Sequence, residues 1–385
     1  MILALHVLTP LLSVAAVNEI EINFTSPTAP FTFEYGVDHG PLCDAPCLQW
    51  SAGKCVNKSS AASVAGQLRG MGARYIRTHD MGVLDWPVVF PHPLSLAGGA
   101  TTADTTDARM YEWAAADEFF GRIVDSGLKP YFRLGTSWGQ PGGGLPPSTV
   151  PYNRTALVDV LLHTVMHYND GWGGGRRFAT RQIAYLEIWN EPDSAVQPHD
   201  GRFWCGFSAA AAAAAVAAAA DRDAAAAFRN RSSADFHLLV GDTISALKAY
   251  DPKLKVGSDG CALVEWPSLN PPPPTVQNRT DYSWGLMAAL AKRKLPLDFF
   301  SWHAYTSNVA IYAQFATDVR AHLDAAGYTQ TEQHVTEWAP DIAVTSNKPQ
   351  VQDTAFGAAT VGATLTTLIA HNVSDDADAL PDAGC

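Results

Sequence analysis

Two glutamates at the ends of strand-like apolar runs are the side chains best placed to do chemistry. Glu191 lies in the run Ile183–Pro192 and Glu337 lies in the run Gln333–Pro340, and in each run β-branched or aromatic residues precede the glutamate. A strand that stops at a carboxylate projects it beyond the sheet. Hydrolysis of a glycosidic bond needs two facing carboxyl groups, one to protonate the leaving oxygen and one to attack the anomeric carbon or activate water. The pattern predicts that Glu191 and Glu337 form such a pair.

Each glutamate alone has an ordinary structural explanation. Glu191 could be an acid at a helix N-terminus, where free backbone N–H groups stabilise negative charge. Glu337 could be a surface acid. The catalytic hypothesis gains its weight from the two together, on the fourth and seventh strands of one predicted barrel.

Strand-like and helix-like segments alternate along most of the chain, which predicts a parallel sheet covered by helices. The expected strands are Phe31–Val37, Arg74–Asp80, Lys129–Gly135, the run that ends at Glu191, Leu254–Ser258, Leu297–His303 and His334–Trp338. The expected helices are Ser59–Met71, Met110–Ser126, Thr155–His167, Trp284–Arg293, Ile311–Ala326 and Thr354–His371. This repetition favours an α/β fold of the TIM (β/α)8 barrel type. A dinucleotide-binding fold is disfavoured because no glycine-rich loop follows the first strand.

Two segments fit the barrel poorly. The tail after His371 is acidic and rich in turn formers, so the eighth strand is expected to be absent or curtailed. Ala209–Ala227 is almost all alanine, which has high helix propensity but no large side chain to pack. It is interpreted as an exposed, low-complexity insertion.

The carboxyl ends of barrel strands converge on one site, so polar residues there are candidate substrate contacts. Arg77 and His79 are two residues apart and share a strand face. If that face points inward, Arg77 can hold a carboxylate ionised while His79 contacts substrate. The other predicted substrate-binding residues at strand ends are Asn190, His303, Tyr305, Trp138 and Trp338.

Composition limits the partners. The chain has 385 residues, 47% hydrophobic and 17% charged, with a formal net charge of -12. This charge argues against nucleic acid and anionic membranes, which select basic surfaces. Met1–Val17 is apolar and ends in small residues, so residues 1–16 are interpreted as a signal peptide and 17–385 as one catalytic domain. Stable membrane insertion is not expected, because this segment is short and contains Pro10.

The segment therefore predicts secretion or passage into an endomembrane or lysosome-like lumen. Sequons for glycosylation at Asn23, Asn57, Asn153, Asn230, Asn278 and Asn372 agree with that prediction. Six cysteines permit disulfides, and Cys43, Cys47 and Cys55 cluster in one early loop. Zinc is disfavoured because no second Cys/His cluster completes a ligand set, so neither a metal nor a cofactor is expected.

An ordered series of motifs resembles the clan A glycoside hydrolases, and within them family 39, the group of β-xylosidases and α-L-iduronidases. The motifs are IRTHD at Ile76–Asp80, YFRLG at Tyr131–Gly135, HYNDGWGGG at His167–Gly175, EIWNEPD at Glu187–Asp193, FW at Phe203–Trp204, KAYDPKLKVG at Lys248–Gly257, SWHAY at Ser301–Tyr305 and VTEW at Val335–Trp338. The resemblance as a whole covers about Phe31 to Trp338, most of the chain. The family usually adds a clear eighth strand and often an accessory β-sandwich, which this sequence does not predict.

The resemblance implies a retaining glycosidase that acts by double displacement on an oligosaccharide or glycoside. Glu191 would be the acid/base, Glu337 the nucleophile, and Asn190 the partner of the sugar 2-hydroxyl. His79 and His303 would line the subsite for the cleaved sugar. Two alternatives stay open: a non-catalytic carbohydrate-binding barrel, and a clan A β-glucosidase or endoglycanase of another family.

Overall fold

The structure is a computed structural model. It describes residues 36–38, 47–51, 54–58, 65–79, 81–92, 94, 103–136, 153–178, 180–183, 185–192, 222–262, 280–340 and 354–375. The predicted signal peptide, Trp138 and most of Ala209–Ala227 lie outside these ranges.

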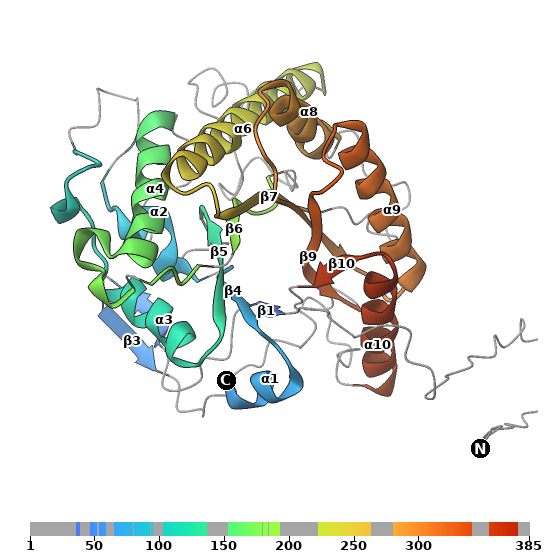
Figure 1. Ribbon diagram of the computed structural model, residues 1–385, viewed down its shortest axis with the longest axis horizontal. Helices are drawn as coiled ribbons and strands as arrows, with labels where there is room; N and C mark the ends of the chain where they lie inside the picture. The colour runs from blue at the N-terminus through green and yellow to red at the C-terminus, as the bar shows by residue number, and fades with distance from the viewer. Residues whose placement is uncertain are drawn as a thin grey trace, which may run out of the picture. The chain divides into compact units, whose positions relative to one another are not determined.

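Eight parallel strands form one sheet whose order follows the chain. They are β1 (Gly36–Asp38), β4 (Tyr75–Arg77), β5 (Lys129–Leu134), β6 (Tyr185–Ile188), β7 (Lys255–Ala262), β8 (Phe299–Tyr305), β9 (Glu332–Ala339) and β10 (Val373–Asp375). A separate antiparallel hairpin joins β2 (Cys47–Ser51) to β3 (Lys54–Lys58). Figure 1 shows the strands of the large sheet curling around a common centre. The predicted TIM-like α/β fold is confirmed.

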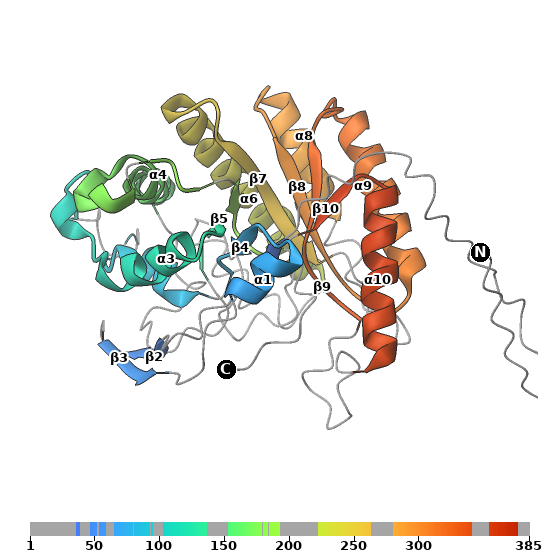
Figure 2. The same ribbon diagram turned by 60° about the horizontal axis from the view of Figure 1, so that its bottom comes forward.

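Helices cover the outside of this curled sheet, as Figures 1 and 2 show for α6, α8, α9 and α10. The α-helices are α1 (Ala65–Met71), α2 (Trp86–Val89), α3 (Ala114–Asp125), α4 (Arg154–Asp170), α6 (Arg222–Tyr250), α8 (Gly285–Lys292), α9 (Val309–Ala325) and α10 (Ala355–Ala370). Short turns of 3-10 helix are η1 (Gly82–Leu84), η2 (Ala108–Met110), η3 (Trp172–Gly174) and η4 (Arg176–Phe178), and η5 (Thr280–Trp284) is a π-helical turn. Within these described helices, no apolar stretch is long enough to span a membrane.

The main hydrophobic core lies between the strands and the helices. On β8 the outward-facing Phe300 and Trp302 are fully buried, and Trp302 and Trp338 both contact Tyr312 of α9. Each large apolar side chain buried in this way contributes about 1.5–3 kcal/mol. The core therefore holds the barrel wall rigid beneath the strand ends.

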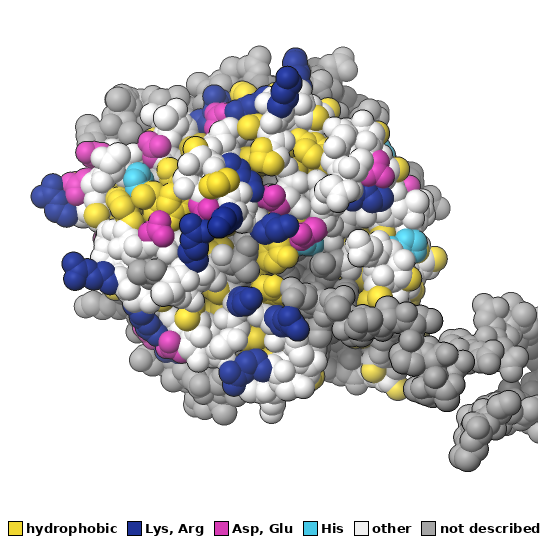
Figure 3. All heavy atoms as spheres, in the orientation of Figure 1, with side chains coloured by type: hydrophobic (Ala, Val, Ile, Leu, Met, Phe, Trp, Pro, Cys, Tyr) yellow, Lys and Arg dark blue, Asp and Glu magenta, His cyan; other side chains and the backbone are white. Residues whose placement is uncertain are grey.

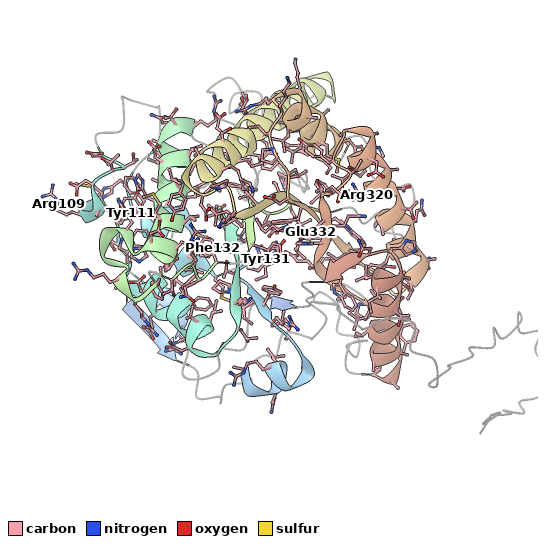
Figure 4. The ribbon with its side chains drawn as sticks, in the orientation of Figure 1. Arg109, Tyr111, Tyr131, Phe132, Arg320 and Glu332 are labelled. Atoms are coloured by element: carbon pink, nitrogen blue, oxygen red, sulfur yellow. The ribbon has the colours of Figure 1, made fainter. Side chains whose placement is uncertain are left out.

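Aromatic side chains fill the barrel interior near the strand starts. Tyr131 stacks on Tyr185 at 5.3 Å between ring centroids, and His334 stacks on Phe299 at 4.6 Å. A Cβ atom at Gly257 would lie 2.3 Å from a Phe299 backbone oxygen, so this strand position requires glycine. Tyr131 and Glu332, both labelled in Figure 4, are joined through His334, whose two ring nitrogens lie 3.1 Å from the Tyr131 hydroxyl and 3.1 Å from Glu332 Oε2. This aromatic layer closes the interior below the polar residues described next.

Figure 3 shows Lys and Arg side chains over much of the face in view, with Asp and Glu side chains beside some of them. Lys255 pairs with Glu332 at 2.6 Å, and Lys248 pairs with Asp298 at 2.6 Å. At these two pairs a carboxylate neutralises the lysine.

Two predictions about elements needed correction or qualification. A strand does follow α10, although it is only three residues long: Val373 pairs in parallel with Gln333 and is 1% exposed. Its ladder is made by backbone groups, so acidic side chains beside Val373 do not prevent it. Outside the large sheet, the described residues form only the β2–β3 hairpin and no β-sandwich.

The long helix α6 was not predicted, and it includes the last six residues of the alanine-rich run. Its buried residues recur at helical spacing: Phe236, Leu239, Val240, Ile244 and Leu247. This apolar period can be recognised in the sequence and predicts a helix, although it follows directly on the alanine-rich run. The interpretation of the remaining alanines as an insertion is untested, because they lie outside the described residues.

Candidate functional site

Inward-facing side chains from β4, β6, β8 and β9 meet at the carboxyl ends of these strands. Tyr75 points into the aromatic layer, so Arg77, two residues later, points inward one level higher. In β8 the same alternation makes Phe299, His303 and Tyr305 point inward. Strand periodicity therefore places a polar site above an aromatic floor.

Arg77 is the centre of the site and is fully buried. Its Nε donates to Glu187 Oε2 at 2.7 Å, its Nη1 to Glu337 Oε1 at 2.8 Å, and its Nη2 to Asn190 Oδ1 at 2.7 Å. Charge-assisted bonds of this kind are short and strong. One guanidinium therefore orients groups from β6, β9 and the turn after β6.

The two predicted catalytic glutamates lie close together. One carboxylate oxygen of Glu191, one of Glu337 and a ring nitrogen of His303 all lie within 4.8 Å of one another. His303 Nδ1 is 2.7 Å from Glu191 Oε1 and 3.4 Å from Glu337 Oε2. The two predicted glutamates and His303 therefore form one compact group at the strand ends.

Glu337 is surrounded by donors and positive charge. Tyr305 donates its hydroxyl to Glu337 Oε2 at 2.7 Å, and His79 Nε2 lies 3.2 Å from Glu337 Oε1. Burial would raise the pKa of Glu337, but His303, His79 and Arg77 outweigh burial and hold that pKa well below its ordinary value. This environment therefore favours the ionised form of Glu337.

His303 is fully buried between the two carboxylates. Burial disfavours its charged form, but the charges of Glu337 and Glu191 outweigh that penalty and raise the pKa of His303 to about 9. Its second ring nitrogen, Nε2, lies 3.1 Å from Thr336 Oγ1. At neutral pH this ring is a buried cation held by both glutamates.

The turn that carries Glu191 has an unusual backbone. Trp189 and Glu191 have φ angles of +73° and +42°, in the left-handed region that costs a non-glycine residue about 1–2 kcal/mol. Pro192 disfavours the right-handed helical conformation at the residue before it. Gly135 has φ +137°, and a Cβ there would lie 2.9 Å from the Trp189 ring. This backbone strain occurs at the turn where the Glu191 side chain departs from the direction of strand β6.

Asn190 offers an amide group to a ligand. Its Oδ1 accepts from Arg77, which fixes the orientation of the amide. Its Nδ2 is buried and makes no hydrogen bond within the described part of the chain. A buried donor without a partner costs about 1–3 kcal/mol, a penalty that a ligand hydroxyl would relieve.

The structure brings together Arg77, His79, Asn190, Glu191, His303, Tyr305 and Glu337, all predicted from the sequence. Trp338 is a correction. Adjacent strand residues point to opposite faces, so with Glu337 inward Trp338 points outward, and its fully buried ring packs against Tyr312. It presents no surface to a substrate. Trp138 lies outside the described residues.

A uronic-acid sugar would need a free guanidinium to bind its carboxylate. Arg77 is occupied by protein carboxylates, and Arg133, 2% exposed, pairs with the buried Asp85 at 3.0 Å. Neither guanidinium is open to a sugar acid.

Two residues of the site were missed in the sequence. Glu187 is fully buried and accepts from Arg77, and Thr336 Oγ1 donates to Glu187 Oε1 at 3.0 Å. A glutamate in the middle of an apolar strand was a readable signal for Glu187, because such a charge is buried only with a partner. Thr336 had no comparable signal.

The group of Glu191, His303 and Glu337 has the donor types that could hold a metal ion. Arg77 pairs with Glu337 and His303 pairs with Glu191, so both of these carboxylates already have protein partners. A metal would also need the lone pair on His303 Nδ1, which a proton occupies in the cationic ring. The arrangement suits an uncharged, hydroxyl-rich ligand better than a divalent cation.

No protein-family model matches the chain, and no curated protein matches its sequence. Solved structures do share its fold. The glucosidase from Croceicoccus marinus aligns with a TM-score of 0.60 and 20% identity, over 90% of this chain and 59% of that chain. The GH39 enzyme from Xanthomonas axonopodis pv. citri aligns with a TM-score of 0.51 and 19% identity, over 82% and 54%. The chain thus spans a little over half the length of these proteins and resembles them in fold, as its motifs predicted.

Proposed function

We propose that the chain is a glycoside hydrolase that retains anomeric configuration, with Glu337 as nucleophile and Glu191 as acid/base. The observation that carries this proposal is the approach of the Glu191 and Glu337 carboxylate oxygens to within 4.8 Å at the strand ends. Retaining enzymes hold these groups about 5–5.5 Å apart, whereas inverting enzymes need about 6.5–9.5 Å to admit a water molecule.

The chemistry proceeds in two displacements. First, Glu337 attacks the anomeric carbon while Glu191 protonates the departing oxygen, which leaves a glycosyl ester on Glu337. Arg77 and Tyr305 hold the Glu337 carboxylate in place for attack. Esterification removes the negative charge of Glu337. Glu191, now a carboxylate, takes a proton from water, and this water releases the sugar with its original configuration.

A neutral sugar fits this site better than a uronic acid. Arg77 and Arg133 are each paired with a protein carboxylate, so neither of these two described arginines is offered to a sugar carboxylate. The Nδ2 of Asn190 suits a 2-hydroxyl group, whose bond to the enzyme can strengthen in the transition state. Since the motifs resemble family 39, a β-xyloside is the first substrate to test.

The test is hydrolysis of aryl xyloside, glucoside, galactoside, arabinoside and iduronide by the intact chain and three variants. Glu337→Gln should abolish turnover, because no covalent intermediate can form. Glu191→Ala should show a burst and then slow turnover, since an activated aryl group departs unprotonated but no base activates water. Glu118→Gln, on the exposed face of α3, is the control and should match the unaltered protein.

Azide identifies the roles, because it attacks the glycosyl ester without needing a base. It should restore turnover in Glu191→Ala and yield a glycosyl azide with the configuration of the substrate. Rescue of Glu337→Gln in place of Glu191→Ala would reverse the two roles. Sugar binding without hydrolysis of any glycoside would favour the carbohydrate-binding protein instead.

We also propose passage through the secretory pathway, on the basis of the apolar residues 1–16 and the sequons. Asn372 is exposed, as a glycosylated residue must be, and Asn153 is half-buried at the start of α4. Treatment of the protein from its native cells with an N-glycan amidase should lower its mass. An unchanged mass together with a retained Met1 would contradict this proposal.

A further inference from the structure

A chain of hydrogen bonds runs through the barrel interior behind the two catalytic glutamates. Thr336 Oγ1 is 3.0 Å from Glu187 Oε1 and 3.1 Å from His303 Nε2. His303 Nδ1 continues the chain to Glu191 Oε1 at 2.7 Å. Glu187, Thr336 and His303 are all fully buried, so bulk water cannot replace any of these bonds.

The direction of each bond follows from counting protons. Glu187 accepts from Arg77 through Oε2 and from Thr336 through Oε1, so both of its oxygens act as acceptors. Thr336 has a single hydroxyl proton, and it is committed to Glu187. The contact between Thr336 and His303 therefore needs a proton on the ring, so His303 Nε2 must be the donor.

This assignment leaves Nδ1 as the ring nitrogen whose proton can leave. Nδ1 faces Glu191 at 2.7 Å and Glu337 at 3.4 Å. Among the described residues, the other charged or titratable groups beside Glu337 include Arg77 and His79, which carry or can carry positive charge, and Tyr305, which donates to it. Among these neighbours, Glu191 is the one placed closest to the exchangeable proton.

We propose that Glu187 and Thr336 are positioning residues that keep a proton on His303 Nε2, so that the Nδ1 proton of His303 is the one exchanged with Glu191. This inference rests on the proposed function. In the first displacement the Nδ1–H bond breaks, an O–H bond forms on Glu191, and that carboxyl protonates the leaving oxygen. In the second, Glu191 takes a proton from water and returns it to Nδ1. The ring alternates between cation and neutral Nε2–H form, and the proton count closes over the cycle.

The strand register explains how Thr336 reaches this position. Trp302 pairs with Val335 and His303 with Glu337, so Thr336 is an extra residue in β9. Such a bulge turns two consecutive side chains to one face, and both Thr336 and Glu337 point inward. If Thr336 only filled space, valine would serve equally well, because it has the same shape without the hydroxyl. The experiment therefore compares Thr336 with valine at this position.

The variants are Thr336→Val, which removes the hydroxyl at constant shape, and Thr336→Ser, which keeps it. Thr243→Val is the matched control, because Thr243 is also fully buried and its hydroxyl has no hydrogen-bond partner in the described structure. Near-ultraviolet circular dichroism establishes that each variant is folded.

The first measurement is ¹⁵N NMR of the histidine rings, with the His303 signals assigned by their loss in His303→Gln. Above the His303 pKa of about 9, the unaltered protein should keep a proton on Nε2 and lose it from Nδ1. Thr336→Val should instead show the neutral ring protonated on Nδ1, and Thr336→Ser should restore the original form. A ring that is protonated on Nδ1 in the unaltered protein overturns the proposal whether or not the protein hydrolyses glycosides.

The second measurement is the pH profile of kcat/KM on an aryl glycoside with a poor leaving group. Losing the acceptor for the imidazolium Nε2–H should move the basic limb down by about one to two pH units in Thr336→Val. Thr336→Ser and Thr243→Val should leave it in place. If the unaltered protein turns over substrate and Thr336→Val has the same basic limb, the positioning role is wrong and the proposed function survives. No turnover by the unaltered protein counts against the proposed function, and the NMR result then decides the positioning role alone.

Discussion

Replacing Arg77 with methionine tests the idea that one buried cation holds the site together. The change removes the guanidinium but keeps an unbranched side chain of similar length. Glu187, whose side chain is 0% exposed, loses its cationic partner, while Glu337 keeps His303 and His79. Breaking one partner of a buried ion pair costs about 3–5 kcal/mol, because the remaining charge is stranded. We expect Arg77→Met to lower the free energy of unfolding by that amount, most of it through Glu187.

Urea unfolding followed by tryptophan fluorescence measures this loss. The control is Arg154→Met, which breaks the pair with Asp242, where the two side chains are 34% and 33% exposed. Solvent screens that pair, so the control should cost about 1 kcal/mol or less. Adding Glu187→Leu to Arg77→Met removes the stranded charge and should recover part of the loss.

The difference between the unaltered protein and Arg77→Met should also depend on pH. The pKa of Glu337 is depressed in the folded state, so its stabilising contribution is present above the ordinary value of 4.5 and is lost as pH falls toward the folded value. The difference should therefore narrow as pH falls below 4.5. Equal stability losses in Arg77→Met and Arg154→Met at neutral pH would refute the reasoning.

Three further predictions concern single residues. The pKa of His303 is raised from its ordinary value of 6.5 to about 9, so protonated His303 stabilises the fold fully below pH 6.5 and this contribution should disappear as pH rises through 9. The urea midpoint should fall over that pH range in the unaltered protein, and His303→Gln should lack the decline. Asn190→Ala should lower kcat/KM about tenfold on glycosides with a 2-hydroxyl group and leave 2-deoxy glycosides unaffected. Gly135→Ala, which combines a positive φ with a contact to Trp189, should cost about 1–3 kcal/mol in thermal unfolding, whereas Gly66→Ala, with open space around it, should not destabilise the protein.

Much of the site was predictable because strand periodicity is local. Arg77 and His79 share a face by their spacing, and Asn190 and Glu191 follow an apolar run directly. A parallel barrel then carries every strand end to the same rim, so residues far apart in the chain could be assigned to one site before their contacts were known.

The same reasoning placed Trp338 wrongly. Its position next to Glu337 suggested a shared site, but neighbours on a strand face opposite sides, and the ring lies beneath α9. The helix α6 was missed for another reason: low-complexity sequence before it obscured a regular apolar period.

The sequence by itself determined the alternation of strands and helices, the two glutamates and most of their polar neighbours, because these depend on residue type and spacing within single elements. Only the tertiary structure decided how the charges are connected: that Arg77 serves Glu187 as well as Glu337, and that an extra residue in β9 turns Thr336 inward toward His303. A bulge depends on the pairing register between two strands, and a buried ion pair depends on which strands become neighbours. Both are properties of the assembled sheet, and no single segment encodes them.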